Sequence, residues 1–513
     1  MKRIESEVDM LSALPEPLLH HIMSFLSFQE FVSSSVLCKR WMQAWRTFPE
    51  LEYVDRIHHR TRRGRVMKCF EKILLKRHMD MISICKFRIH MCFLSCHQAS
   101  FVDRCLCYAI GSHVKELELS LERGYKLPQL VLCSKSIEVL QLVGCKLEAH
   151  CDMKLPSLRK LTLYRVYADG RVIEKLVAGS PLIEYLKIDF CHGVKSLELS
   201  NVNKLSKIKV YGGGFSRELK QLDVNALNVH SISLSQLSGP CEINIAPCKS
   251  LKRLKLRRLV IRDEWLCNEM LKLPLLEYLS IMHCNKLESI KISRPSLKEL
   301  LITECSNLVE VNMVTSNLSR FKYSGDVISF LFNDLALSQV DLNLHSENID
   351  DQWYAKYTEL LAKFHQCSKV FYLRSNTGEN VIIPRESRQI LRPPLFGVKH
   401  LDFTVTKGDK DFRIAELVDG LLWISPHAET ISIQYEFTYL DNFSFQFTYK
   451  NRLICEGETP YCCESLPVSC WQDCLKEVKI EHKAFRGSTN VKSCSFKDED
   501  ILAKIDGLCR YNP

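Results

Sequence analysis

The sequence has no long apolar run. Its 513 residues contain no stretch of about 18 or more uncharged apolar side chains, so no membrane span is predicted. The first ten residues, MKRIESEVDM, alternate in charge and lack the apolar core of a secretory signal. We therefore expect a reducing compartment, the cytoplasm, the nucleus or both, in which the 24 cysteines stay free thiols.

The sequence also lacks the short motifs of common enzyme classes. It has no nucleophile elbow, H-E-x-x-H pair, Walker loop or dinucleotide fingerprint. The segment YGGGF (211–215) has no trailing Gly-Lys-Ser/Thr, so we expect a loop between repeats rather than a phosphate loop. We predict a non-catalytic protein without a cofactor.

Several clusters of cysteine and histidine lack the spacing of standard metal sites. The zinc-finger spacing is absent from the first cluster, which consists of His90, Cys92, Cys96 and His97. Paired C-x₂-C units are absent from the second, which consists of Cys462–Cys463, Cys470 and Cys474. We predict no metal site and expect buried thiols instead.

The charge balance is mildly basic. Lys and Arg number 70 against 60 Asp and Glu, a net +10, which permits acidic partners without requiring them. The run RIHHRTRRGRVMK (56–68) has six basic residues and no acidic residue. We predict a solvated basic linker here. The alternative is a nuclear-localisation or nucleic-acid patch, although the run lacks the interleaved aromatics that favour single-strand binding.

Residues 14–45 contain three short helical patterns and end in two tryptophans. Leu18, Ile22 and Phe25 recur at helical spacing, and Trp41 and Trp45 lie four residues apart on one helix face. A segment of about 45 residues is near the lower limit for an independent core. Some of these large side chains are therefore expected to stay exposed for a partner; the alternative is a small helical cap on a larger domain.

The order of these residues resembles the F-box over residues 9–53. The resemblance implies docking onto the Skp-type adaptor of a cullin–RING ubiquitin ligase. Cys38 departs from the Ser usual in relatives and is expected to begin the third helix as a weaker cap. The resemblance assigns adaptor binding to Leu11, Leu14, Pro15, Leu18, Leu19, Ile22, Phe25, Leu26, Val36, Leu37, Lys39, Arg40, Trp41 and Trp45.

From residue 114 an L-x-x-L-x-L pattern recurs. Leu117, Leu140, Leu161 and Leu186 stand 23, 21 and 25 residues apart, within the period of leucine-rich repeats. Leu279, Ile290, Leu300 and Val311 follow at 11, 10 and 11 residues, which predicts two strands per turn, one on each face. Alternate side chains should point outward; these include Glu116, Glu118, Lys160, Lys187, Lys209, Lys255, Arg257 and Lys298.

The same pattern places cysteines just after strands. LVGCKL (142–147), IMHCNKL (281–287) and ITECSNL (302–308) carry Cys where leucine-rich repeats take Asn or Cys to turn the chain. Beyond 345 the repeats become fainter. We expect a helix over 350–367, strands over 398–405 and 429–437, and a last repeat-like strand with Leu475, Val478 and Ile480.

The whole chain resembles plant F-box/leucine-rich-repeat proteins with a divergent C-terminal FBD-like region. LLWISPHAETISI and CWQDCLKEVKIEHKAFRG carry the FBD likeness, but the sequence departs from it after residue 487. The predicted fold class is α/β: a three-helix F-box, an irregular leucine-rich-repeat solenoid (horseshoe) and a C-terminal α+β extension. The expected parts are a tail (1–8), an F-box (9–54), a basic linker and helical lead-in (55–113), leucine-rich repeats (114–345), and further repeat-like strands with the FBD-like region (346–513).

The resemblance implies the substrate-recognition subunit of a Skp–cullin–F-box ligase. The F-box would dock the Skp adaptor, and the repeat surface would bind an unidentified target protein for ubiquitination. The alternatives are a non-ligase interaction scaffold and a nucleic-acid-binding solenoid that uses the 56–68 run; the F-box argues against nucleic acid as the main partner, because nucleic-acid binding does not need it.

Overall fold

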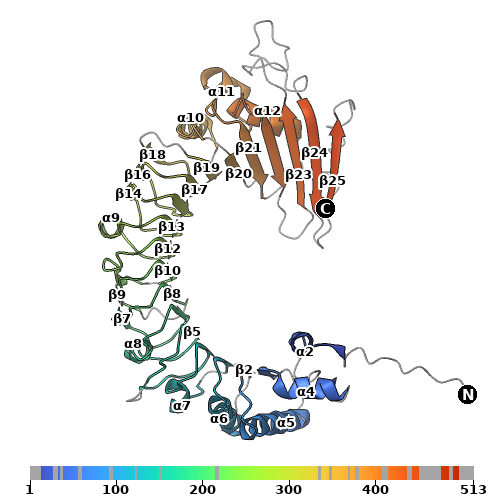
Figure 1. The fold of residues 1–513 in the computed structure, drawn as a ribbon. Coiled ribbons are helices and arrows are strands. Elements are labelled where there is room, and N and C mark those ends of the chain that lie inside the picture. The colour runs from blue at the N-terminus through green and yellow to red at the C-terminus, as the bar shows by residue number, and fades with distance from the viewer. Residues whose placement is uncertain are drawn as a thin grey trace, which may run out of the picture. The chain divides into compact units, whose positions relative to one another are not determined.

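The computed structural model divides the chain into two compact units, Met1–Leu251 and Lys252–Pro513. Both units consist of many short strands with helices between some of them (Figure 1). The structure describes residues 13–26, 30, 33–34, 38–55, 60–91, 96–121, 124–149, 153–213, 219–237, 239–332, 337–345, 349–367, 370–375, 381–406, 414–435, 442–449, 475–483 and 489–495.

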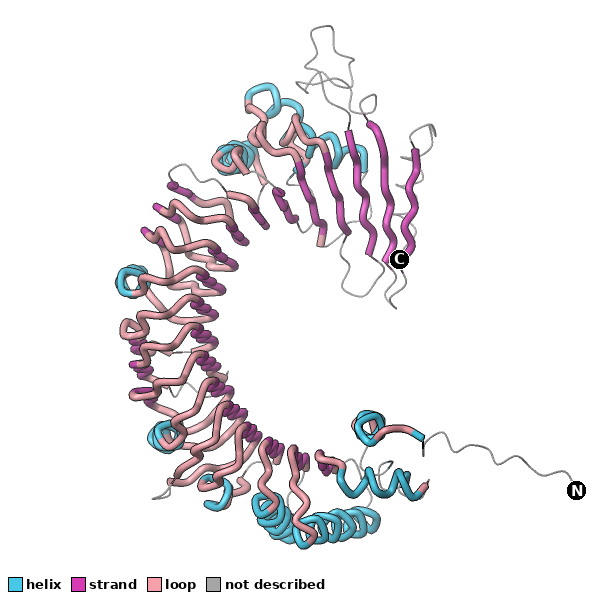
Figure 2. The backbone as a smooth tube through the Cα atoms, viewed as in Figure 1, coloured by secondary structure: helices cyan, strands magenta, loops and turns pink. Residues whose placement is uncertain are grey.

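A parallel sheet forms the spine of the first unit, with its strands stacked side by side (Figure 2). Each strand pairs with the next in the order β1–β2–β3–β4–β5–β6–β8–β10. The strands are β1 (Glu50–Val54), β2 (Lys86–His90), β3 (Glu116–Ser120), β4 (Val139–Val143), β5 (Lys160–Tyr164), β6 (Tyr185–Asp189), β8 (Lys207–Tyr211) and β10 (Ser231–Ser235).

The predicted alternation places the second and fourth residues of these strands in the core. Leu117, Leu140, Leu161 and Leu186 are at most 1% exposed. Because side chains alternate across a pleated strand, the first, third and fifth residues point away from this core. Neighbouring turns thus bury one another's leucines, which a single repeat cannot do alone.

A second set of strands lies at half the repeat spacing. In the first unit β7 (Ser196–Ser200), β9 (Gln221–Asn225) and β11 (Glu242–Asn244) form a separate parallel sheet. In the second unit β14 (Ser289–Ser293), β16 (Glu310–Val314) and β18 (Ser329–Phe332) do the same. The prediction of two strands per turn, drawn from Leu279 to Val311, is therefore confirmed, and the later turns of the first unit have the same arrangement.

The chain turns sharply after each main strand. Gly144, Arg165 and Phe190 follow β4, β5 and β6 with φ of 75°, 51° and 52°, the left-handed region. The N–H of Gly144 donates to the carbonyl of Tyr164 at 3.0 Å, and that of Arg165 to the carbonyl of Asp189 at 2.9 Å. Each turn is therefore tied to the end of the next strand.

The region 55–113 is more than a linker. Residues 56–59 lie outside the described part, but the rest of the basic run belongs to the helix α5 (Arg60–Met79), and β2 follows before the helix α6 (Cys96–Gly111). Phe70 of α5 packs against Tyr53 of β1 and Phe101 of α6, with ring centroids 5.3 and 6.4 Å away. The parallel sheet thus begins at β1, earlier than the predicted start at residue 114.

Shorter helices precede β1 or connect later strands of the first unit. They are α2 (Glu16–Met23), α4 (Lys39–Thr47), α7 (Gln129–Leu132) and α8 (Gly170–Ala178). Among the described residues, none of the helices is long and apolar enough to cross a membrane.

The second unit repeats the parallel sheet and then changes its pairing. The parallel strands are β12 (Arg253–Arg257), β13 (Tyr278–Met282), β15 (Glu299–Thr303), β17 (Arg320–Gly325), β19 (Gln339–Leu344), β20 (Val370–Ser375), β21 (His400–Val405) and β22 (Thr430–Tyr435). Its helices are α9 (Asp263–Lys272), α10 (Asp351–Ala362), α11 (Arg385–Ile390) and α12 (Ile414–Ile424).

The last strands of the second unit are antiparallel. From β22 the sheet continues through β23 (Asn442–Tyr449), β24 (Leu475–Lys483) and β25 (Thr489–Ser495), each antiparallel to the one before. The predicted last strand with Leu475, Val478 and Ile480 is present as β24, and it pairs antiparallel on both sides, unlike the repeat strands. The helix over 350–367 and the strands near 398–405 and 429–437 are confirmed as α10, β21 and β22.

Candidate functional site

The N-terminal helices pack around a small apolar core. Leu19 and Met23 of α2 meet Trp41 and Ala44 of α4, and Phe48 closes the cluster. These five side chains are at most 7% exposed. The partly buried Leu14, Leu26, Cys38 and Trp45 pack against the cluster.

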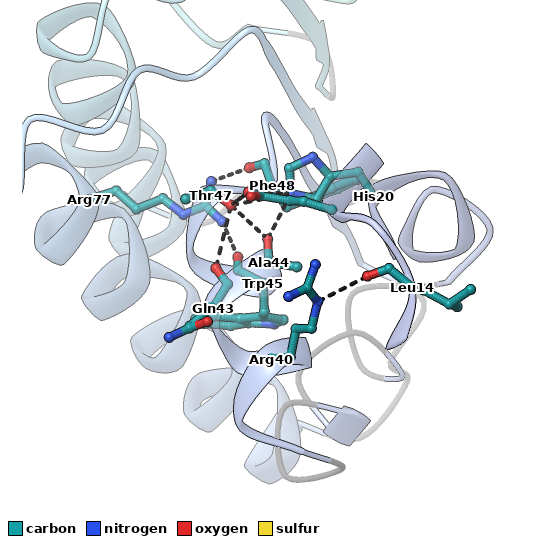
Figure 3. A network of polar contacts seen from close by, with 10 residues as sticks. Leu14, His20, Arg40, Gln43, Ala44, Trp45, Thr47, Phe48 and Arg77 are labelled. Atoms are coloured by element: carbon teal, nitrogen blue, oxygen red, sulfur yellow. Dashed lines mark hydrogen bonds and ion pairs between the residues drawn. The ribbon is translucent and has the colours of Figure 1, made fainter. Parts of the chain in front are cut away.

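Polar contacts fix α2 against α4 (Figure 3). The His20 ring nitrogen Nε2 lies 2.9 Å from the carbonyl oxygen of Ala44, near the C-terminal end of α4. The Thr47 hydroxyl donates to the Glu16 carboxylate, and Arg40 Nε donates to the carbonyl of Leu14 at 2.9 Å. The helix pair is thus held by its apolar core and by side chains that satisfy backbone carbonyls.

Cys38 begins α4 as its N-cap. Its extended backbone has φ −158°, and its thiol accepts a hydrogen bond from the N–H of Trp41 at 3.3 Å. The departure from Ser is therefore compatible with a capped helix. The Trp41 indole N–H donates to the Ser34 hydroxyl at 2.9 Å, which satisfies its buried donor.

Arg77 of α5 fastens the N-terminal helices to the rest of the unit. Its guanidinium donates to the carbonyls of Trp45, at 2.7 Å, and Phe48 (Figure 3). A cation at the C-terminal end of a helix satisfies free carbonyls and opposes the helix dipole. Arg77 is 3% exposed. Burial lowers its pKa to about 10, so it stays charged at neutral pH.

The outer side of α2 leaves large apolar side chains uncovered. Leu18, Ile22 and Phe25 are 50%, 37% and 75% exposed, and Pro15 is exposed at the start of the helix. We call Pro15, Leu18, Ile22 and Phe25 the α2 face. Apolar groups gathered on one side of a small helical unit are typical of a protein-binding surface.

The structure divides the residues that we predicted to contact an adaptor. Lys39 and Arg40 are exposed at the start of α4. Leu19 and Trp41, at 0% and 2% exposed, belong to the core of the helix pair rather than to its exposed surface. Leu11, Val36 and Leu37 lie outside the described residues, as does most of the predicted second helix.

The outward face of the first unit's main sheet starts with paired charges. Arg88 of β2 lies 3.5 Å from Glu52 of β1 and 3.4 Å from Glu118 of β3. Lys86 lies 3.5 Å from Glu116. The outward basic side chains of β2 and the outward acidic side chains of β1 and β3 therefore neutralise each other at this end of the sheet.

The other residues predicted to point outward do so. Lys160, Lys255, Arg257 and Lys298 are exposed, while Lys187 and Lys209 are half-buried on the sheet face. In the second unit Lys255 lies over the ring of Tyr278, 5.3 Å from its centroid.

The cysteines that follow strands are buried and protonated. Cys145 is fully buried and Cys305 is 8% exposed, and their thiols donate to the carbonyls of Val143 and Thr303 at 3.6 and 3.7 Å. Burial raises the pKa of each thiol to about 12. Among the described residues no group of three or more Cys, His, Asp or Glu side chains could hold a metal ion. Cys92, Cys462, Cys463, Cys470 and Cys474 lie outside the described residues, as do the side chains of Cys96 and His97.

This arrangement is that of a small helical unit joined to a repeat solenoid, and comparisons with known proteins agree. Residues 11–53 match the F-box domain. Residues 74–240 and 239–481 match the family model described as the At1g61320/AtMIF1 LRR domain, which covers more than half of the chain. The chain therefore belongs to the plant F-box/leucine-rich-repeat proteins.

Individual relatives are more distant. The F-box/LRR-repeat protein 25 of Arabidopsis thaliana is 26% identical over 46% of this chain and 90% of its own length. The F-box/LRR-repeat proteins At3g03360 and At5g02910 of the same plant are 25% and 24% identical, over 58% and 46% of this chain and 61% and 50% of theirs. The matched segments therefore span between half and nine tenths of these relatives.

Proposed function

We propose that this protein is the substrate receptor of an SCF-type ubiquitin ligase. The F-box domain favours a role in substrate recognition. In the proposed complex the α2 face docks a Skp-type adaptor, which joins the chain to a cullin–RING ligase, and the outward face of the parallel sheet binds the target protein. The FBD-like region extends the solenoid at its C-terminal end.

The exposed apolar side chains of the α2 face carry this proposal. Folding leaves Leu18, Ile22 and Phe25 in water, although Leu19 and Met23 of the same helix are buried. Exposure of apolar area costs free energy, and a partner that covers this face recovers it. Truncation of a central apolar anchor commonly costs more than about 1 kcal/mol of binding free energy.

The receptor role needs no catalytic residue in this chain. A receptor that holds a target beside the ubiquitin-transferring enzyme raises the effective concentration of the acceptor lysine. Arg77 supports such a role, because it fixes the F-box helices to the first repeats through the Trp45 and Phe48 carbonyls.

The direct test is co-purification with a Skp-type adaptor. A Leu18→Ala, Ile22→Ala variant should recover at least about tenfold less adaptor than wild type, because two anchors are lost. The matched control is Leu182→Ala, Leu227→Ala, which truncates two leucines of the same unit that are 37% and 64% exposed. Equal recovery by wild type and the α2 variant would reject the proposed docking face.

An interaction scaffold outside any ligase is the second candidate. It would share the target-binding face but would not need the adaptor. Wild-type protein that binds no Skp-type adaptor while retaining a stable target complex would favour this candidate.

A further inference from the structure

Lysine and tyrosine side chains cover the outward face of β5, β6 and β8 in the first unit. The parallel register places nine outward residues in three rows across these strands. The rows are Lys160–Tyr185–Lys207, Thr162–Lys187–Lys209 and Tyr164–Asp189–Tyr211. We call these nine residues the lysine–tyrosine block.

Neutral strands border the block on both sides. On one side β4 presents Val139, Gln141 and Val143 in the same rows. On the other side β10 presents serine at all three outward positions, 231, 233 and 235. The block is therefore a separate basic area, unlike β1–β3, where Arg88 is paired with carboxylates on both sides.

Three of the four lysines in the block have no compensating acid. Lys187 lies 2.7 Å from Asp189, which holds the pKa of this lysine above its ordinary value through their hydrogen bond. Lys160, Lys207 and Lys209 form no ion pair with any carboxylate in the described part of the chain. Three positive charges thus remain uncompensated on one sheet face.

These three charges are gathered over one aromatic ring. The ammonium groups of Lys160, Lys207 and Lys209 lie 5.6, 5.9 and 5.9 Å from the centroid of Tyr185. Each gains from the negative face of the ring, but together they repel one another. A negatively charged partner would relieve that repulsion, whereas a neutral partner would bury the three charges without neutralising them.

We propose that the lysine–tyrosine block binds an acidic, extended segment of the target protein. This inference deepens the proposed function, because it names the chemistry of the target. Alternate side chains of an extended peptide are about 7 Å apart, which is also the spacing of Lys207 and Lys209 along β8. Lys160, two strands away from Lys207, lies about 10 Å across the sheet. Carboxylates at alternate positions can therefore meet neighbouring lysines.

The tyrosine rings favour a peptide over a nucleic acid. Single-strand binding depends on bases stacking against open aromatic faces. In the block, lysine ammonium groups already lie over Tyr185 and over Tyr211, the latter 5.6 Å from Lys187. A peptide carboxylate needs the ammonium groups alone and leaves these cation–ring contacts in place.

The test uses full-length protein and fluorescent peptides in which glutamate or glutamine alternates with serine. A variant with Lys160→Gln, Lys207→Gln and Lys209→Gln should bind the glutamate peptide at least about tenfold more weakly than wild type. The difference should shrink as salt is added. The matched control replaces Lys135, Lys154 and Lys220 by Gln, which removes the same charge from exposed positions of the same unit.

A charge reversal keeps the test decisive if the triple variant folds poorly. The Lys207→Glu, Lys209→Glu variant should lose the glutamate peptide and gain affinity for a peptide in which lysine alternates with serine. Equal losses in the control variant, binding of the glutamine peptide as tightly as the glutamate peptide, or no binding of the glutamate peptide by wild type would each overturn the proposal.

An oligothymidylate probe and an adaptor assay separate the remaining outcomes. Tighter binding of the oligothymidylate than of the glutamate peptide, lost in the triple variant, would overturn the peptide proposal in favour of a nucleic acid. Adaptor co-purification is measured on the same proteins and should be unchanged by the lysine substitutions. Lysine variants that lose peptide binding but recover adaptor normally support the proposed peptide site in the lysine–tyrosine block. Failure of the wild-type protein to recover adaptor counts against the ligase role and not against the peptide site.

Discussion

Removal of the Arg77 guanidinium should loosen the junction between the F-box helices and the solenoid. The two hydrogen bonds from this charged group are worth about 1.5–3 kcal/mol each, and burial of the charge offsets part of that gain. An Arg77→Ala substitution removes both guanidinium hydrogen bonds to the carbonyls of Trp45 and Phe48 and leaves a cavity where the side chain lay. We therefore expect a loss of about 2–4 kcal/mol in local stability. Arg77→Met keeps the apolar stem and should lose about 1–2 kcal/mol.

Hydrogen exchange read by mass spectrometry can localise this loss. Amides of α4 and of the segment through Phe48 should exchange faster in Arg77→Ala, while those of β5 and β6 should be unchanged, because repeat stability depends on near neighbours. The matched control is Lys76→Ala, an exposed cation one residue away. Equal exchange of α4 in the two variants would refute the view that Arg77 fastens the junction.

Two further predictions concern the solenoid core. Leu161, fully buried between Leu140 and Leu186, should lose about 2–5 kcal/mol on substitution by Ala, whereas Lys160→Ala should lose about 1 kcal/mol or less, the size of an exposed cation–ring contact. Equal shifts of the two thermal midpoints would contradict the alternation. The Cys145 thiol, with its burial-raised pKa of about 12, should react with iodoacetamide far more slowly in the native protein than after unfolding in urea; comparable rates by mass spectrometry would show that the site is open.

The repeat core could be predicted because burial on a strand has a period of two residues. Leu117, Leu140 and Leu161 stand at the core positions that the L-x-x-L-x-L pattern assigns them. The half-spacing from Leu279 to Val311 likewise predicted a second strand in each turn, because neither strand can bury its leucines without a neighbour.

The first two strands were missed because helices lengthen their turns. Glu50, Lys86 and Glu116 begin β1, β2 and β3 at intervals of 36 and 30 residues, beyond the ordinary repeat period. The core residues of β1 and β2 include Tyr53 and Phe87 in place of leucine, so the repeat motif is absent although the alternation is present. A search for short alternating strands before residue 114 could have found both.

The sequence predicted an apolar patch in the F-box but could not divide it into core and surface. Leu18 and Leu19 are equally apolar neighbours on α2, and their exposed fractions are 50% and 0%. Helical periodicity alone does not tell which apolar side meets the protein's own core and which is left for a partner. Arg77 was missed for a related reason, since a buried cation that caps a distant helix has no local sequence pattern.

The antiparallel end of the second unit could not be predicted from alternation. The strand that carries Leu475 and Val478 has the same two-residue period as a parallel repeat strand. The direction of pairing depends on the connections that bring β23, β24 and β25 together, and strand periodicity contains no information about them.

Ubiquitin transfer in a reconstituted ligase tests the central claim most directly. Full-length protein is combined with a Skp-type adaptor, a cullin, its RING partner, the activating and conjugating enzymes and ubiquitin, and conjugates on the chain's own lysines are measured. Proximity to the transferring enzyme predicts conjugates on wild type and on the Leu182→Ala, Leu227→Ala control, and their loss in the Leu18→Ala, Ile22→Ala variant. Wild type that remains unmodified in this mixture, or equal conjugation of the α2 variant, would contradict the account.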